Sequence, residues 1–213
     1  MRDGFVLLDA AGAVEREIPA DAQEPRRRMN DGRCDPSGRF WAGTMDTEFR
    51  RADGQLFRLN GSSASVAADG LRLSNGLGWS PDARTMYLVD TLAAVIWRAP
   101  FDVAAGAMGA REPLCEVPDA WGKADGLCVG ADGDVWIACY GAGAVRRLSP
   151  DGALRDTHAL PVSRPTCPCL SPDGTLYVTT AQGDAGTAPE PGAGAIFALA
   201  VDAPGLPTTR FAG

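Results

Sequence analysis

The sequence has almost no lysine or histidine and no long apolar run. Lys123 is the single lysine among 20 basic residues, and His158 is the single histidine. No stretch approaches the roughly 18 apolar residues of a membrane-spanning helix, and the opening MRDGFVLLDAAG is too interrupted for a signal peptide. With 27 acidic residues, a net charge of −7 and no basic stripe, we expect neither nucleic acid nor a membrane as a partner, and a cytoplasmic protein.

The turn-forming residues limit the possible fold classes, and the cysteines limit the possible disulfides and metal sites. The 26 glycines and 16 prolines exclude a helical bundle and indicate short strands separated by turns. Five of the six cysteines lie beside β-type runs, so we expect reduced, packed thiols rather than disulfides. Cys167 and Cys169 are separated by one residue, which is shorter than the spacing in zinc sites, and thiolate zinc is disfavoured.

One segment recurs four times along the chain. Each copy has an Asp, Pro or Gly turn followed by an aromatic or β-branched run, which is typical of a hairpin turn that leads into a strand. The copies are DPSGRFWAGT (35–44), SPDARTMYLVDT (80–91), GADGDVWIACY (130–140) and SPDGTLYVTTA (171–181). Their turn anchors are Gly38, Ala83, Gly133 and Gly174, at steps of 45, 50 and 41 residues. Ala83 departs from glycine, so we expect a slightly strained turn there.

A second β pair follows each copy, beginning near residues 54, 94, 143 and 194. Four short strands per repeat of 40 to 50 residues, without helical periodicity, predict an all-β protein and specifically a β-propeller. The opening residues 4–18 are typical of the outer half of a further blade. We therefore expect residues 1–213 to form a single propeller domain of about four and a half blades, incomplete at its N-terminus, whose ring stays open.

A polar residue stands eight positions before each turn anchor. These residues are Asn30, Asn75, Asp125 and Thr166. We expect this position to precede the innermost strand of each blade, so that oxygen donors from separate blades converge on the axis and bind a hard cation. Alternatively, Asn, Asp and Gly at equivalent turn sites are only turn formers. One carboxylate holds a divalent ion poorly, so the cation hypothesis requires another acid.

The order and spacing of four motifs resemble the gluconolactonase family that includes regucalcin. They are RMNDGRCDPSGRFWAGTMD, LSNGLGWSPDARTMYLVDT, ADGLCVGADGDVWIACYGAGAVRRLSPDG and PVSRPTCPCLSPDGTLYVTTA. The resemblance covers nearly the whole chain. It implies a six-bladed propeller that binds one divalent cation on its axis and hydrolyses sugar lactones.

The resemblance also implies roles for individual residues. Asn75 and Asp125 match metal ligands, and Asp125 also matches the proposed general acid/base. Arg28 and Asn30 match residues that contact substrate, and Glu48 falls where the family can place a further substrate-contacting acid. The family's remaining ligand is a glutamate in a Gly-Glu-Gly-Pro-like motif, which this sequence lacks. The implied site for the divalent cation (Ca²⁺, Zn²⁺, Mn²⁺ or Mg²⁺) therefore lacks one protein ligand.

Three functional hypotheses follow. The first is a metal-dependent lactonase whose substrate is a small sugar lactone. The second is a related propeller hydrolase that acts on other esters or on phosphotriesters. The third is a non-catalytic, metal-binding propeller, which the missing glutamate favours and the retained polar residues disfavour. The oligomeric state is not predicted.

The remaining aromatic residues and the histidine have structural interpretations. Trp41, Trp79, Trp97 and Trp136 fall in strand-like runs, so we expect them in the core. Trp121 precedes Asp125 closely enough to wall a pocket. His158 lies in a polar stretch, so we expect it on the surface, and no Ser-His-Asp triad is available.

Overall fold

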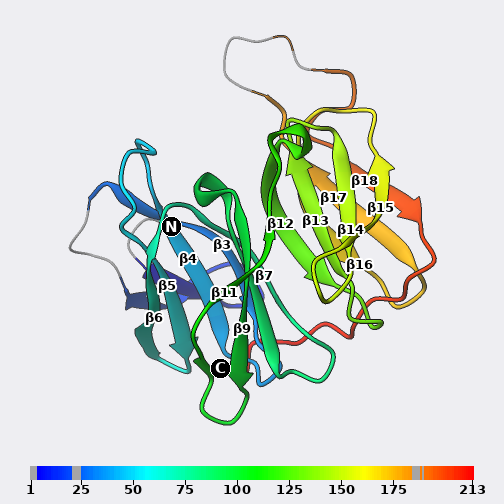
Figure 1. Ribbon diagram of the computed structural model, residues 1–213. Coiled ribbons are helices and arrows are strands. Elements are labelled where there is room, and N and C mark those ends of the chain that lie inside the picture. The colour runs from blue at the N-terminus through cyan, green and yellow to red at the C-terminus, as the bar shows by residue number, and fades with distance from the viewer. Residues whose placement is uncertain (1–3, 21–24, 184–187, 189) are drawn as a thin grey trace.

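The computed structural model describes residues 4–20, 25–183, 188 and 190–213, and within them the chain is almost entirely β-structure. In this described part, eighteen strands form five antiparallel sheets arranged as a fan around a common axis, as in a β-propeller (Figure 1). The only helical segments in the described part are two single turns, η1 (Thr91–Ala93) and η2 (Asp119–Trp121). The all-β prediction is confirmed.

Each sheet corresponds to a blade or part of one. The first sheet pairs β1 (Gly4–Leu8) with β2 (Val14–Pro19). The β3 blade contains β3 (Arg27–Cys34), β4 (Phe40–Asp46), β5 (Gly54–Asn60) and β6 (Ser63–Leu71). The β7 blade contains β7 (Ser74–Trp79), β8 (Thr85–Asp90), β9 (Val95–Asp102), β10 (Ala107–Met108) and β11 (Glu112–Glu116).

The other half of the fan holds two blades. The β12 blade contains β12 (Lys123–Val129), β13 (Val135–Tyr140), β14 (Ala144–Leu148) and β15 (Leu154–Ala159). The β16 blade contains β16 (Pro165–Leu170), β17 (Thr175–Thr180) and β18 (Ile196–Ala200), three strands among the described residues. The residues that the structure describes thus contain four blades and a two-stranded sheet, as the repeats predicted. That residues 1–213 form one domain stays a prediction.

The four predicted turn anchors have the backbone conformation that the hairpins require. Gly38, Gly133 and Gly174 have φ values of 84°, 87° and 82°, in the left-handed region that glycine adopts freely. Ala83 occupies the equivalent turn with φ 58°, which strains a residue that has a Cβ atom. The expectation of a strained turn at Ala83 is confirmed.

Apolar side chains fill the spaces within and between the blades. Trp41 and Trp136 are fully buried, Trp79 is 5% exposed, and Trp97 is partly buried against the same cluster as Trp79. His158 lies in strand β15 and stacks on Trp136 with ring centroids 5.1 Å apart. The surface prediction for His158 was wrong, because its ring covers the indole. All six cysteines are free, as expected.

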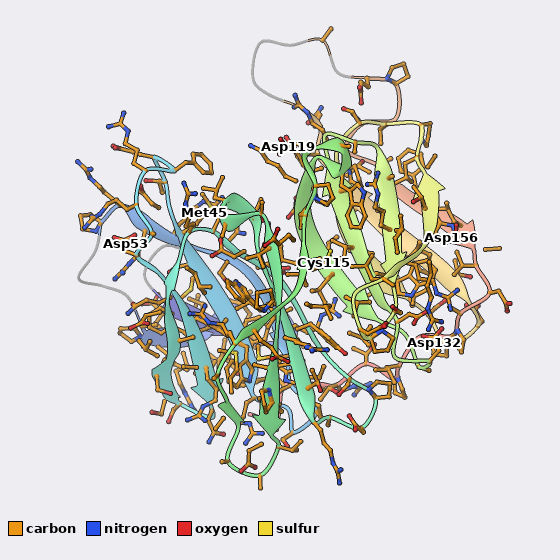
Figure 2. All side chains as sticks on the ribbon, viewed as in Figure 1. Met45, Asp53, Cys115, Asp119, Asp132 and Asp156 are labelled. Carbon is orange, nitrogen blue, oxygen red and sulfur yellow. The ribbon has the colours of Figure 1, made fainter. Side chains whose placement is uncertain are left out.

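Buried carboxylates brace the hairpin ends of two blades. Asp35, which is fully buried, accepts hydrogen bonds from Arg39 Nε at 2.7 Å and from Trp41 Nε1 at 3.0 Å. Asp134 is also fully buried and pairs with Arg147 Nε at 2.6 Å. In Figure 2, Asp132 marks this hairpin end of the β12 blade and Asp119 marks its opposite end.

The C-terminal segment after β18 crosses the hairpin end of the fan (Figure 1). Its backbone bonds successively to the β16 blade (Gly205 N to Ser171 O, 2.9 Å), the β12 blade (Ala131 N to Pro204 O, 2.8 Å) and the β3 blade (Ala212 N to Gly38 O, 2.9 Å). Its side chains Ala203, Leu206 and Phe211 join three of the four apolar clusters. The segment therefore connects blades that are distant in sequence. Among the described residues no helix has the length and apolar character to cross a membrane.

Candidate functional site

The four polar repeat positions lie inside the innermost strands, each at a β-bulge. The register of pairing shifts between Met29 and Gly32, between Ser74 and Leu77, between Ala124 and Leu127, and between Pro165 and Cys167. Our expectation that these residues precede the strand was wrong. An extra residue at a bulge re-aims the neighbouring side chain, and the same bulge recurs in all four blades.

Glycines directly after two of these positions bring adjacent blades close together. A Cβ atom on Gly76 would lie 2.2 Å from Leu127 N and 2.8 Å from Asp125 O of the next blade. A Cβ atom on Gly126 would lie 2.7 Å from Thr166 O. The innermost strands β7, β12 and β16 pack side by side, and their backbones approach this closely only because these glycines have no side chain.

Asn75 and Asp125 meet at the junction of the β7 and β12 blades. Burial raises the pKa of Asp125 to about 7, against the opposing effect of a hydrogen bond from the Asn75 side chain, and the nearby Asp31 charge raises it further. Asn75 is itself only 7% exposed. The two predicted metal ligands are therefore in contact, with Asn75 buried and Asp125 half-buried.

Asp31 is the second acid at this site, and sequence reasoning missed it. Burial raises the pKa of Asp31 above its usual value, while the Gly32 N–H, which bonds Asp31 Oδ1 at 2.7 Å, lowers it. Its charge raises the pKa of Asp125. The equivalent positions in the next blades are Gly76, Gly126 and Cys167, so the signal was an acid at a position where two of the other three repeats have glycine.

Arg28 and Asn30 form a pair at the start of strand β3. Arg28 Nη1 donates to Asn30 Oδ1 at 3.0 Å and to Met29 O at 2.9 Å. Asn30 Nδ2 donates to Ser74 O at 2.9 Å, just before Asn75. The two predicted substrate-binding residues are thus brought together, and Asn30 bonds the strand that carries Asn75.

Glu48 belongs to a separate group of charges on the turn between β4 and β5. It pairs with Arg26 at 3.5 Å and Arg50 at 3.3 Å, with 42% of its side chain exposed. The turn is held by Asp46, whose carboxylate accepts from the backbone N–H groups of Glu48, Arg50 and Arg51, with Asp46 Oδ2 2.8 Å from Arg50 N. Within the described residues, Glu48 makes no hydrogen bond or ion pair with Asn75 or Asp125.

Two further candidates have partners of their own. Thr166, the fourth repeat position, shares a hydrogen bond of 2.8 Å between its Oγ1 and that of Thr179, within its own blade. Trp121 packs against an apolar cluster, with the Arg146 guanidinium carbon 5.0 Å from its ring centroid. The candidate donors with contacts between blades are therefore Asn30, Asn75 and Asp125, from the β3, β7 and β12 blades.

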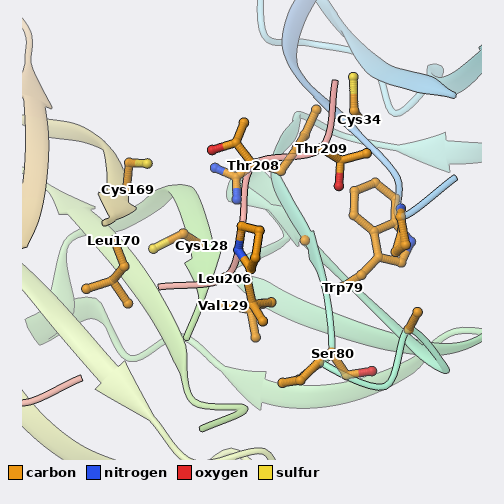
Figure 3. Close-up of a pocket in the computed structure, with 16 residues that line it drawn as sticks. Cys34, Trp79, Ser80, Cys128, Val129, Cys169, Leu170, Leu206, Thr208 and Thr209 are labelled. Carbon is orange, nitrogen blue, oxygen red and sulfur yellow. The ribbon is translucent and has the colours of Figure 1, made fainter. Parts of the chain in front are cut away.

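Two cavities lie along the innermost strands. Asn30 and Asp31 line a cavity of about 360 Å³ between β1 and β3. Another cavity of about 320 Å³ lies at the hairpin end, where Cys128, Cys169, Leu206 and Thr208 surround it (Figure 3). Neither Asn75 nor Asp125 lines either of these cavities, and the hydrogen bond between the two side chains is the reason to place the candidate site at the bulges.

The donors at the bulges fit a hard divalent cation. Asp125 supplies a carboxylate and Asn75 an amide oxygen, which are ligand types that Ca²⁺ and Mg²⁺ accept. The raised pKa of Asp125 shows a carboxylate poorly compensated by its surroundings, and a cation would supply that compensation. No group of three or more His, Cys, Asp or Glu side chains suited to a metal occurs in the described ranges, so amide and water oxygens would complete the coordination.

Known proteins share this sequence pattern and fold. A family profile described as "SMP-30/Gluconolactonase/LRE-like region" matches residues 1–182. The chain is 39% identical to a 6-deoxy-6-sulfogluconolactonase of Pseudomonas putida, over 100% of this chain and 76% of that protein. It is 38% identical to regucalcin of Xenopus laevis, over 76% of this chain and 57% of that protein. A calcium-binding protein, regucalcin, from Agrobacterium tumefaciens has a crystal structure that matches with a TM-score of 0.90 and 30% identity, covering 98% of this chain and 73% of that one.

Proposed function

The chain belongs to the SMP-30/gluconolactonase/LRE-like family, and we propose that it is a lactonase-type hydrolase acting on a small sugar lactone. The observation that carries the proposal is the contact between Asn75 and Asp125 at the blade junction, beside Asp31. The names of the relatives support the same reaction class. Because the chain spans only 57% of the Xenopus regucalcin, the activity of these 213 residues is part of the proposal.

In this proposal Asn75 and Asp125 hold one divalent cation. When bound, such an ion polarises a carbonyl oxygen and lowers the pKa of water. Hard oxygen donors favour Ca²⁺, Mg²⁺ or Mn²⁺ over metals that prefer sulfur, and the activity test below includes Zn²⁺ for comparison. Asp31 adds negative charge close to the pair, which strengthens attraction of a cation.

The chain's own residues handle the proton and the substrate. Asp125 accepts a proton from the attacking water as the water oxygen bonds to the lactone carbonyl carbon. The ring C–O bond then breaks, and Asp125 returns the proton to the oxygen that leaves, so the product is the open hydroxy acid. Arg28 and Asn30 bind substrate oxygens from the β3 blade, and Glu48 accepts a hydrogen bond from a sugar hydroxyl.

The test is hydrolysis of glucono-δ-lactone, followed by acid release with and without Ca²⁺, Mn²⁺ or Zn²⁺. We expect turnover that a chelator abolishes, and a loss of about 100-fold or more in kcat/KM for Asp125→Ala. The matched control is Asp69→Ala, since Asp69 is an exposed aspartate outside the site. A folded Asp125→Ala variant that keeps both activity and cation affinity would contradict the proposal. Cation binding without hydrolysis of any lactone would favour the non-catalytic alternative.

A further inference from the structure

Thr91 lies between the two predicted cation ligands without being one of them. It opens the single turn η1, directly after strand β8. Its hydroxyl is 3.1 Å from Asn75 Nδ2 and 2.7 Å from the backbone oxygen of Ala124, the residue before Asp125. One side chain thus contacts the ligand of the β7 blade and the backbone next to the ligand of the β12 blade.

The hydrogen-bond chemistry of Thr91 fixes the direction of both contacts. A hydroxyl has one proton, and the carbonyl of Ala124 can only accept, so Thr91 donates its proton there. Towards Asn75 the hydroxyl must then accept, which requires the amide nitrogen of Asn75 to face Thr91. The amide oxygen of Asn75 accepts no hydrogen bond from any described residue and is left available to a ligand.

The turn that carries Thr91 is itself held firmly. Asp90 is buried, and its carboxylate accepts from the backbone nitrogens of Leu73 at 2.9 Å, Arg72 at 3.0 Å and Ala93 at 3.4 Å. The backbone nitrogen of Thr91 donates to Leu73 O at 3.0 Å. The hydroxyl therefore has a fixed position relative to strand β7, which carries Asn75.

We propose that Thr91 is a positioning residue of the cation site: it sets the orientation of the Asn75 amide and the spacing between Asn75 and Asp125. This inference rests on the proposed function, because the ligand that uses the Asn75 oxygen is the proposed cation. Removing the hydroxyl leaves the Asn75 amide nitrogen with the Asp125 carboxylate but without its second hydrogen bond, and it removes the bond from Thr91 to the Ala124 carbonyl. Outer partners of metal ligands typically change metal affinity by about 10–100-fold.

The experiment compares Thr91→Val with Thr91→Ser, using calorimetric titration of Ca²⁺ and of Mn²⁺ alone. Thr44→Val is the matched control, because Thr44 is fully buried and its hydroxyl bonds only the backbone of Gln55, at 2.8 Å and 3.3 Å. We expect about tenfold or weaker cation affinity for Thr91→Val, and affinity near the unmodified protein for Thr91→Ser and Thr44→Val. Unchanged affinity in Thr91→Val would overturn the proposal, as would an equal loss in Thr44→Val.

A second measurement separates this inference from the proposed function. The side-chain amide resonances of Asn75 report its hydrogen bond to Thr91 without any cation, and we expect them to shift in Thr91→Val and not in Thr44→Val. If the unmodified protein binds the cation but hydrolyses no lactone, the proposed reaction is overturned. The Thr91 proposal is then decided by the titration of Thr91→Val alone. Unchanged Asn75 resonances in Thr91→Val would overturn the positioning role whatever the activity.

Discussion

Replacing Gly76 with alanine tests whether the close approach of blades at the site depends on a missing side chain. The added Cβ would lie 2.2 Å from Leu127 N, 2.6 Å from Gly126 C and 2.8 Å from Asp125 O, all backbone atoms of strand β12. Backbone cannot rotate away as a side chain can. Strands β7 and β12 would have to separate by about 1 Å to restore ordinary contact distances, since close-packed interiors have little free space.

The expected cost follows from that separation. Overpacking in a well-packed interior costs about 1–3 kcal/mol and sometimes more, and a clash with backbone lies at the upper end. We therefore expect the free energy of unfolding to fall by at least about 2 kcal/mol. Because the backbone that moves includes Asp125, cation affinity should fall as well.

The measurement is urea unfolding followed by the fluorescence of the buried tryptophans, with the midpoint compared at unchanged slope. The control is Gly109→Ala, because a Cβ on Gly109 would meet Pro100 at an ordinary 3.4 Å and its φ is not positive. We expect that control to lie within about 0.5 kcal/mol of the unmodified protein or to be slightly more stable. If Gly76→Ala behaved like Gly109→Ala, the inference that glycine is required for blade contact would be refuted.

Three further predictions concern two buried carboxylates and the reactivity of the thiols. Asp35→Ala leaves Arg39, 9% exposed, without its carboxylate, so chemical unfolding should show a loss of about 3–5 kcal/mol; a loss below about 1 kcal/mol would contradict this. Backbone hydrogen bonds hold the pKa of Asp46 below its usual value, so its stabilisation is present above about pH 4 and is lost as pH falls through the lowered pKa. The stability difference between the unmodified protein and Asp46→Asn should shrink in acid, and a constant difference from pH 7 to pH 2 would argue otherwise. Burial raises the pKa of Cys128 to about 12, whereas Cys169 is exposed. The reaction of the protein with a thiol reagent at pH 8 should therefore lose its fast phase in Cys169→Ser and keep that phase in Cys128→Ser.

The fold could be predicted because its signals are local and repeated. A tight turn followed by a strand has a sequence signature of its own, and four copies at similar spacing left few architectures open. Even the strain at Ala83 could be inferred, because the equivalent turns of the other three repeats have glycine. In the structure those glycines have φ values of 82° to 87°. The β-bulges were not predicted, because a single extra residue per strand leaves no compositional trace.

The site was predicted in part, for a related reason. Asn75 and Asp125 occupy one repeat position, so alignment of the repeats found them. Asp31 and Thr91 each lie off that position, and their roles depend on how neighbouring blades meet rather than on their own strands. His158 was misplaced because its polar neighbours concealed a stacking contact with Trp136, which is distant in sequence.

The C-terminal segment has a consequence for how the chain reaches its final form. It bonds Gly38 near the beginning of the chain and Ser171 near the end, and contacts so far apart in sequence close late and slowly in folding. On the ribosome, the β3, β7 and β12 blades emerge before the residues that join them. The faces later covered by Leu206 and Phe211 therefore stay exposed until that segment has been synthesised.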